Sequence, residues 1–414
     1  MKPLLCLLTI WLLGAGVSPA VGQEKYGFHL RNKQKVARIP FQLHSNLILV
    51  PIRLNNSDTL WFVLDTGVST AILTDSKIPA ARHLMPIRRI KIAGAGEGQS
   101  LSASVTLGST LKMGDMVGYN QTIVVLDEDA LALSEYMGVP VHGIFGYEVF
   151  NNFVVTIDFS NHEITLTKPG HYKYRSRKGE KYPITIEDTK PYMNSVTLVN
   201  HDRTVPLRLL IDTGAGHALS LDVDSRSEIH PPEKVIRAQL GRGLSGVING
   251  NLGRLAKVRI GTVELSNILA CFPDSMAYGL TISQRGNRQG NIGCELLRRF
   301  KVTFNYAEQY MVLKPVRRRL REAFEHNMSG IELIAKGTDF RQFIIDRVLD
   351  GSPADLAGLQ QGDELVSINS QLCRTLNISD IYKVLQRGEG REIVLAVKRE
   401  GRMFITSFAL KRVI

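Results

Sequence analysis

The stretch Phe62-Val-Leu-Asp-Thr-Gly67 has a counterpart further along the chain in Leu209-Leu-Ile-Asp-Thr-Gly214. In both places an apolar run ends in Asp-Thr-Gly, the pattern of a buried strand that leads into a tight turn. Each turn carries one carboxylate, on Asp65 and Asp212, and these acids are 212 − 65 = 147 positions apart. We therefore expect two equivalent strand–turn units, each presenting a single acid.

Other residues recur at the same interval without a net insertion between them. Gly94, Gly96, Gly114, Gly143 and Gly146 recur as Gly241, Gly243, Gly261, Gly290 and Gly293, and Phe153 recurs as Phe300. Glycines at fixed distances mark turns and hairpins at fixed distances. The sequence thus predicts one structural unit written twice.

The N-terminal segment 1–22 has the pattern of a secretory signal peptide. Lys2 precedes an apolar core from Leu4 to Val17, and small residues at 18–22 suit cleavage. The segment is short for a membrane span, and no later segment reaches about 18 consecutive apolar residues. We expect an exported protein, periplasmic or secreted; an uncleaved N-terminal anchor is the alternative.

The length of 414 residues favours two or three domains. Short strand patterns with turn signals, and one short helix in each copy, indicate two all-β lobes. After Gly330 the pattern becomes α+β, with an amphipathic helix expected from Ile378 to Gln386. The predicted division is signal peptide 1–22, basic lead-in 23–40, first lobe 41–168, linker 169–183, second lobe 184–316, basic linker 317–329 and C-terminal module 330–414.

The formal charge of +12 gathers in the lead-in and the two linkers rather than in the repeats. Such runs are typical of solvated connectors, although they also favour contact with an anionic surface. No recognition motif accompanies the charge, so we do not expect nucleic-acid binding.

Three cysteines remain after the signal peptide, Cys271, Cys294 and Cys373. They form neither a disulfide framework nor a metal-ligand spacing. We expect buried free thiols, with a bridge between Cys271 and Cys294 as the alternative.

The paired aspartates predict acid–base chemistry. A single Asp-Thr-Gly also occurs in ordinary turns, but a lone carboxylate at the end of an apolar strand is costly to bury. If the lobes face each other around a pseudo-twofold axis, Asp65 and Asp212 meet and share one proton. The ionised acid then activates a water and the protonated acid polarises a carbonyl, with neither a metal nor another cofactor.

The residues around each acid suit this arrangement. Gly67 and Gly214 allow close approach of the backbone to the carboxylates, and Thr66 and Thr213 are placed to bond to the opposite lobe. The glycine-rich hairpin tips are predicted to close over a substrate as flaps, with merely flexible hairpins as the alternative. These tips contain Gly94, Gly96, Gly241 and Gly243.

The chain resembles the retropepsin-like aspartyl proteases, in particular exported bacterial members that join two lobes to a C-terminal PDZ domain. The resemblance covers about 41–414 and is carried by Leu64-Asp-Thr-Gly67, Ile211-Asp-Thr-Gly214, Gly143-Ile-Phe-Gly146 and Asn291-Ile-Gly293. It implies a mainly β fold with two pseudo-symmetric lobes, a catalytic pair of Asp65 and Asp212, and a cleft for an extended peptide.

Two departures matter. Val68 and Ala215 stand where pepsin-like members place Ser or Thr, which resembles the retroviral style and predicts a less acidic pH optimum than that of pepsin. Gly216-His217 stands opposite Ser69-Thr70, so we expect unlike subsites in the two lobes.

The C-terminal stretch from Gly351 to Asn369 resembles the PDZ signature. PDZ domains bind peptide C-termini by adding a strand beside a carboxylate-holding loop. That loop is expected at Gly330, Ile331, Glu332 and Leu333, where Glu332 replaces the usual small residue. Peptide C-terminal binding and a purely packing role both stay open.

The leading prediction is a monomeric aspartic endopeptidase that acts on protein or peptide substrates. A non-catalytic exported peptide-binding or scaffold protein with the same fold is the alternative. A third arrangement pairs each lobe with its twin in another chain, but the linker of about 14 residues favours pairing within one chain.

Overall fold

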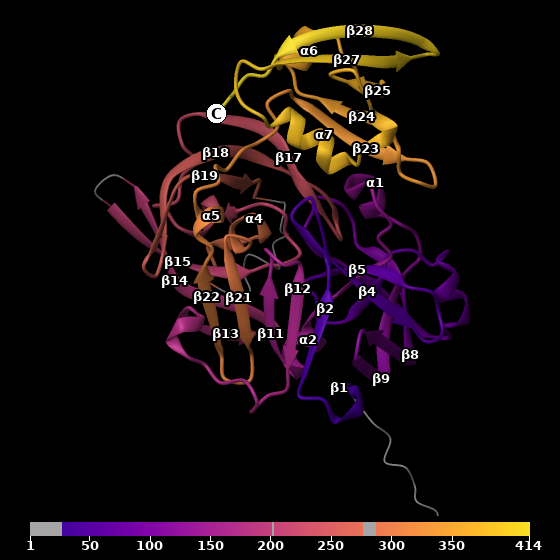
Figure 1. Cartoon of the computed structure of the whole chain (residues 1–414), viewed down its shortest axis with the longest axis vertical. Helices are drawn as coiled ribbons and strands as arrows, with labels where there is room; N and C mark the ends of the chain where they lie inside the picture. Colours follow the sequence, from indigo (N-terminus) through magenta and orange to yellow (C-terminus); the bar gives the residue numbers. More distant parts are fainter. Residues whose placement is uncertain (1–26, 201–202, 276–286) are drawn as a thin grey trace, which may run out of the picture.

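The computed structural model describes residues 27–200, 203–275 and 287–414 (Figure 1). The predicted signal peptide 1–22 and the first part of the lead-in lie outside the described residues. Strand accounts for 50% of the structure and helix for 12%, so the predicted mainly β class is confirmed. In the described part of the chain, no helix has the length and apolar character needed to cross a membrane.

The first lobe is a mixed sheet that closes on itself. In spatial order its strands are β1 (Gly27–Leu30), β9 (Met116–Leu126), β6 (Ala71–Leu73), β10 (Gly143–Phe145), β5 (Leu60–Leu64), β4 (Leu47–Leu54), β8 (Leu101–Met113) and β7 (Pro86–Ile92), with β3 (Gln42–His44) beside β4. Its helices are η1 (Arg31–Lys33), η2 (Pro79–His83), α1 (Leu133–Met137) and α2 (Tyr147–Asn152). The ring closes because β8 also pairs with β9. β5, which leads to Asp65, lies between antiparallel β4 and parallel β10.

The second lobe repeats this topology. Its strands are β17 (Val235–Gly243), β18 (Gly246–Ile260), β19 (Val263–Pro273), β16 (Leu219–Leu221), β20 (Gly290–Ile292), β15 (Arg203–Ile211), β14 (Lys190–Asn200) and β13 (Glu180–Glu187). Its helices are η3 (Ser176–Lys178), η4 (Val223–Ser225), α4 (Cys294–Leu297) and α5 (Arg317–Leu320). Here β18 pairs with β14 to close the ring, and β15, which leads to Asp212, runs parallel to β20.

One continuous sheet joins the two lobes. From β13 it runs through β22 (Tyr310–Pro315), β21 (Phe300–Asn305), β11 (Val154–Asp158), β12 (Glu163–Thr167) and β2 (Val36–Pro40). At its centre β11 pairs antiparallel with β21, and Thr156 lies opposite Thr303. These threonines are 147 positions apart and their hydroxyl oxygens are 2.9 Å apart. Each thus pairs with its own counterpart, so the pseudo-twofold axis passes between them.

The basic lead-in and the first basic linker contribute strands to the sheets instead of acting only as connectors. β2 lies inside the predicted lead-in and buries Ala37 and Ile39, while β13 begins inside the predicted linker 169–183 and buries Tyr182. In both strands the basic side chains occupy outward positions and apolar ones alternate with them. This alternation of buried and exposed residues is that of a β-strand. The runs of basic residues led instead to the prediction of solvated connectors.

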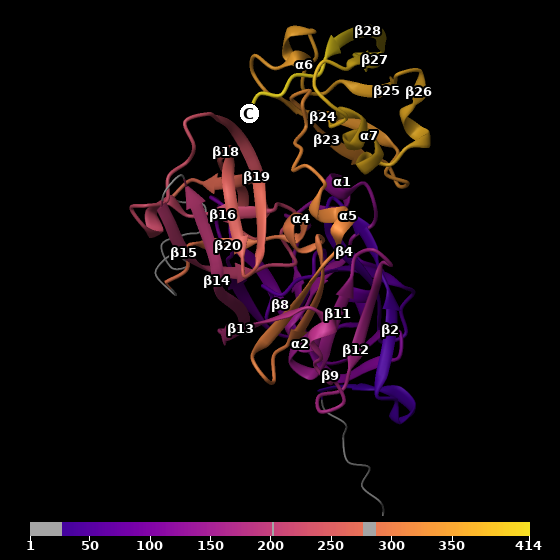
Figure 2. The same ribbon diagram turned by 60° about the vertical axis from the view of Figure 1, so that its left-hand side comes forward.

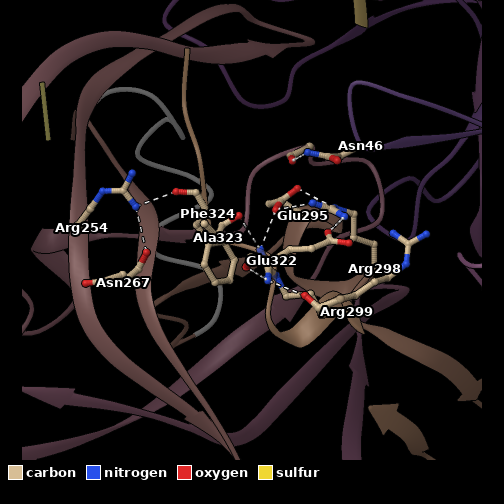
Figure 3. Close-up of polar contacts among 11 residues, drawn as sticks. Asn46, Arg254, Asn267, Glu295, Arg298, Arg299, Glu322, Ala323 and Phe324 are labelled. Carbon is tan, nitrogen blue, oxygen red and sulfur yellow. Dashed lines mark hydrogen bonds and ion pairs between the residues drawn. The ribbon is translucent and has the colours of Figure 1, made fainter. Parts of the chain in front are cut away.

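The predicted basic linker 317–329 is packed against the second lobe. Arg299 is fully buried, and its guanidinium donates to the backbone oxygens of Arg319 and Glu322 at 2.9 and 2.5 Å. The same group donates to Glu295 Oε1 at 3.0 Å and lies 3.5 Å from the centre of the Phe324 ring (Figure 3). A buried guanidinium needs such partners, and here all of them except Glu295 on α4 come from the linker itself.

The C-terminal module has its own apolar core. Its sheet is β23 (Ile331–Lys336), β24 (Gln342–Val348), β25 (Glu364–Ile368), β27 (Glu392–Arg399) and β28 (Arg402–Ala409), with β26 (Gln371–Leu372) beside β25. Its helices are α6 (Pro353–Leu356), η5 (Cys373–Thr375) and α7 (Ile378–Leu385). Helix α7 ends one residue earlier than predicted. Both views place this module over α1 of the first lobe (Figures 1 and 2), and Glu135 forms an ion pair with Lys336 there.

The cysteines behave as expected from their apolar surroundings. Cys271, Cys294 and Cys373 are all buried and free. The alternative of a bridge between Cys271 and Cys294 is therefore not realised.

Candidate active site

β5 and β15 each end at an aspartate that stays bonded to the next strand. The Asp65 N–H donates to Phe145 O on β10, and the Asp212 N–H donates to Ile292 O on β20, both at 2.9 Å. β10 and β20 run parallel to β5 and β15. The backbone thus holds both acids at equivalent points of their lobes.

The two carboxyl groups lie close together at the lobe boundary. Asp65 Oδ1 accepts a hydrogen bond from Gly67 N at 2.6 Å, and Asp212 Oδ1 accepts one from Gly214 N at 3.0 Å. A methyl group on Gly214 would overlap the Asp65 carboxyl, and one on Gly67 would lie 3.9 Å from Asp212 Oδ1. Asp65 therefore lies so close to the turn of the second lobe that only glycine fits at position 214, while Asp212 lies at an ordinary contact distance from the Gly67 position.

Thr66 and Thr213 are fully buried and bind the opposite lobe. Thr66 Oγ1 donates to Ile211 O at 2.6 Å, and Thr213 Oγ1 donates to Leu64 O at 2.8 Å. Each hydroxyl therefore ties the other lobe's strand end, one residue before that lobe's aspartate.

The proximity of the acids raises the proton affinity of Asp65. Burial, followed by the charge of Asp212, raises the pKa of Asp65 to about 7, while the Gly67 N–H and the more distant charge of Lys190 act in the opposite direction. Burial also raises the pKa of Cys294 and of Tyr306, so both stay neutral beside the acids. Asp65 therefore keeps its proton at a pH at which an exposed aspartate has lost it.

The surroundings of the acids are not symmetric. Asn291 Nδ2 donates to Asp212 Oδ2 at 2.9 Å, and Asn291 Oδ1 lies 3.1 Å from His217 Nε2. From the sequence, His217 was recognised as a difference between the two lobes, whereas Asn291 was assigned only to an apolar turn. A comparison of the two copies could have singled out Asn291, because the residue 147 positions earlier is the apolar Ile144.

The tips of hairpins β7–β8 and β17–β18 bond to each other. The Ser245 N–H donates to Ala95 O at 2.9 Å, and the Glu97 N–H donates to Val247 O at 3.0 Å. The Gly98 N–H donates to Ser245 O at 2.5 Å, and these two residues are 245 − 98 = 147 positions apart. The tips therefore meet on the same pseudo-twofold axis as the acids.

Three of the four predicted flap glycines lie at this contact. The Gly94 N–H donates to Ser245 Oγ at 3.1 Å, and a side chain at Gly96 or Gly243 would overlap the backbone of the opposite tip. A methyl group on Gly241 would have no neighbour within 4 Å, so this glycine takes no part in the contact.

The second tip also reaches the wall of the first lobe. Leu244 packs against the same apolar cluster as Val68 and Ile144. Val68 directly follows the first Asp-Thr-Gly turn, so the second tip and this turn border the same apolar cluster. The sequence did not predict this contact of Leu244.

The predicted peptide-binding loop, residues 330–333, leads into and begins β23. The Ile331 N–H donates to Ser329 Oγ at 3.1 Å, and the Leu333 N–H donates to the Tyr382 hydroxyl on α7 at 2.8 Å. Hydroxyl groups of the module itself thus occupy two N–H groups at the place expected for a peptide terminus. Binding of peptide C-termini at this loop stays a prediction.

Potential metal ligands do not gather anywhere in the described ranges: no group of three or more His, Cys, Asp or Glu side chains there is placed to hold an ion.

Comparison with protein families agrees with this architecture. The model described as aspartyl protease matches residues 50–149 and 196–296, and the model described as PDZ domain matches residues 344–399. A comparison with curated proteins found no match. Asp65 and Asp212 each fall inside one of the matched aspartyl protease regions. The chain therefore contains two aspartyl protease regions in tandem, followed by a C-terminal PDZ domain.

Proposed function

We propose that this protein is an aspartic endopeptidase in which Asp65 and Asp212 form one catalytic dyad. The family matches indicate a peptidase. The dyad itself is supported by one observation above all: the carboxyls of two equivalent Asp-Thr-Gly turns lie together at the lobe boundary, each against the other's glycine. Aspartic proteases are the standard case of two such carboxyls that share a proton.

In the proposed mechanism the dyad holds a water molecule between its carboxyl groups. The ionised carboxylate takes a proton from this water as the oxygen attacks the peptide carbonyl carbon. The protonated carboxyl gives its proton to the carbonyl oxygen, which avoids a free oxyanion. The dyad then gives a proton to the leaving nitrogen and takes one back from a hydroxyl group of the tetrahedral intermediate as the C–N bond breaks, so it ends with the one proton it started with.

The substrate class is an extended peptide. The hairpin tips would close over it, and their backbone groups would exchange tip-to-tip bonds for bonds to the peptide, as in strand addition. Gly216-His217 and Ser69-Thr70 differ in size and polarity at equivalent places. The two halves of the cleft would therefore select different side chains.

The test is cleavage of a peptide library with and without pepstatin. We expect pepstatin-sensitive cleavage that is lost in Asp65→Asn and, separately, in Asp212→Asn. Activity should fall as pH rises through about 7, because Asp65 then loses the shared proton. Binding of library peptides without any cleavage by the wild type would instead support the non-catalytic scaffold. Full activity of either variant would exclude a dyad.

Export and peptide docking belong to the same proposal. Residues 1–22 support export to the periplasm or the medium, and N-terminal sequencing of the mature protein tests it, because an uncleaved chain would begin at Met1. The PDZ fold supports docking of a peptide or substrate. Calorimetry of the full chain with a peptide ending in a free carboxylate and with its amide distinguishes C-terminal docking, which requires the carboxylate, from a packing role.

A further inference from the structure

The lobes differ most sharply at the side chains next to their acids. Asp212 Oδ2 accepts a hydrogen bond from Asn291 Nδ2 at 2.9 Å. The residue equivalent to Asn291 in the first lobe is Ile144, because 291 − 147 = 144, and its side chain has no donor. The dyad therefore receives an amide N–H from one lobe that the other lobe does not supply.

The backbone fixes Asn291 in this position. It is the middle residue of β20, where it pairs with Leu210 on one side and with Ser220 on the other. Only 8% of the residue is exposed. A side chain at this point of a strand held on both sides has little freedom, so the bond to Asp212 is part of the fold.

His217 fixes the orientation of the amide. Its Nε2 lies 3.1 Å from Asn291 Oδ1, and because Asn291 Nδ2 already donates to Asp212, Oδ1 must accept. The imidazole therefore carries its proton on Nε2. The opposite amide orientation would place Oδ1 against the Asp212 carboxylate oxygen, which is unfavourable whichever tautomer His217 adopts.

The loop that carries His217 is itself held by both lobes. The His217 carbonyl accepts the Glu295 N–H at 3.2 Å, and the neighbouring Gly216 carbonyl accepts Asn46 Nδ2 from the first lobe at 3.1 Å. The equivalent position in the first lobe is Thr70, because 217 − 147 = 70. The chain from His217 through Asn291 to Asp212 is thus a one-sided extension of the dyad.

We propose that Asn291, oriented by His217, makes Asp212 the ionised member of the dyad and leaves the shared proton on Asp65. A donor that bonds to one carboxylate favours the charged form of that carboxylate over its neighbour. Asp212 is then the base that takes the proton from water, and Asp65 is the acid that gives its proton to the carbonyl oxygen. This deepens the proposed function and rests on it; Asn291 and His217 are positioning residues.

The other ionisable groups near the acids do not reverse this assignment. Lys190 from β14 favours a charge on Asp65, but its effect is the smallest of those that act on this acid. Tyr306 after β21 and Cys294 on α4 remain neutral because burial raises the pKa of each. Burial lowers the pKa of His217, so the imidazole is neutral and acts as a donor rather than as a charge.

The first test needs no substrate. In protein labelled with ¹³C at the aspartate carboxyls, and assigned with Asp65→Asn and Asp212→Asn, the wild type should show a protonated Asp65 and an ionised Asp212 at about pH 5–6, below the pKa of about 7 of Asp65. A proton found on Asp212 instead would overturn the proposal in the wild type itself, whether or not the protein cleaves peptides. Correct proton placement without any cleavage would count against the proposed function alone.

The second test uses variants and the pH dependence of kcat/KM. Asn291→Leu should move the acid limb up by about 1–2 pH units, because the ionised base then loses the hydrogen bond that stabilises its charge. KM should change less than about twofold, since the bond serves the proton and not the peptide. His217→Phe should shift the acid limb of kcat/KM in the same direction, but by less than Asn291→Leu does. His217→Gln keeps an N–H donor and should therefore leave the acid limb close to its wild-type position.

Ile144→Leu is the matched control, because it alters the equivalent position without removing a polar bond. It should leave the acid limb in place. An acid limb that stays unchanged in both Asn291→Leu and His217→Phe would overturn the proposal. If Asn291→Leu does not fold, the His217 pair and the wild-type proton placement still decide between the outcomes.

Discussion

Thr66 and Thr213 bond to each other's backbone in both directions. The Thr66 N–H donates to Thr213 Oγ1 and the Thr213 N–H donates to Thr66 Oγ1, each at 3.0 Å, and the two residues are 147 positions apart. Because each hydroxyl also donates to the opposite strand end, the pair closes a ring of bonds around the pseudo-twofold axis. This ring holds the two acid-bearing turns in register.

Replacing one of these hydroxyls should loosen both lobes at once. Thr66→Val keeps the shape of the side chain but leaves the Thr213 N–H and Ile211 O without their bonds to it. Each buried group left unpaired costs about 1–3 kcal/mol, so for two groups we expect a loss of roughly 2–6 kcal/mol in stability and a large loss of peptidase activity. Calorimetric melting and peptide cleavage measure the two effects.

Thr106→Val is the control for this change. Thr106 is also buried but makes one bond, to Ile123 O at 3.2 Å within the first lobe. We expect a smaller loss of stability and unchanged cleavage. Equal effects of the two variants on cleavage would show that the ring does not organise the acids.

The contact between the hairpin tips depends on Gly96. Its φ of +122° disfavours other residues, and a methyl group there would overlap the backbone of Gly246. Gly96→Ala should therefore separate the tips, accelerate amide exchange at Gly98 and Ser245, and raise KM. Gly108→Ala is the control, because Gly108 has a φ of +74° but no neighbour within 4 Å. Slow exchange at the tips of Gly96→Ala would refute this view of the closed hairpins.

Glu148 should make stability depend on pH. Burial raises its pKa to about 7 from 4.5, one oxygen accepts the Ala71 N–H at 3.2 Å, and the other has no hydrogen-bond partner among the described residues. The folded state thus holds this proton more tightly than the unfolded state. The resulting stability is fully present below about pH 4.5 and is lost as pH rises through about 7.

Glu148→Gln should therefore match the wild type near pH 4 and be more stable at pH 8, by an amount of the order of 3 kcal/mol. Melting temperatures at the two pH values test this. Glu295, 147 positions later, pairs with Arg298 and Arg299, so Glu295→Gln should destabilise at pH 8 instead. A gain in Glu148→Gln that is the same at both pH values would contradict the titration.

Tyr136 on α1 links the PDZ module to the second hairpin. Its hydroxyl lies 3.1 Å from Asp346 Oδ2 on β24 and accepts a hydrogen bond from Arg242 Nη2 on β17 at 3.2 Å. Tyr136→Phe removes both bonds to charged groups, and amide exchange in β17 and β24 should become about tenfold faster. Tyr119→Phe, on the exposed surface of the first lobe, should change neither strand. Unchanged exchange in Tyr136→Phe would show that the module and the hairpin are independent.

The interval of 147 was enough to predict the two lobes, the acid pair and the threonines that bond across the boundary, because counterparts of a duplicated unit meet on its symmetry axis; the bonds between the two hairpin tips follow the same rule but were not predicted. Features that break the symmetry were not predictable in this way. The donor role of Asn291 depends on its side-chain rotamer, and the strand β2 was hidden by the charge of the lead-in. Helix α1 was not predicted either, because it has no side-chain cap. It packs against β23, which begins 331 − 137 = 194 positions after the helix ends.

The most direct test of the central claim is whether both acids of one active site come from one chain. Asp65→Asn and Asp212→Asn should each lose at least about a thousandfold in kcat/KM. An equimolar mixture of the two folded variants should stay as inactive as either one alone, because each chain then carries a broken dyad. Recovery of activity in the mixture, or substantial activity of one variant alone, would contradict a dyad formed by Asp65 and Asp212 within a single chain.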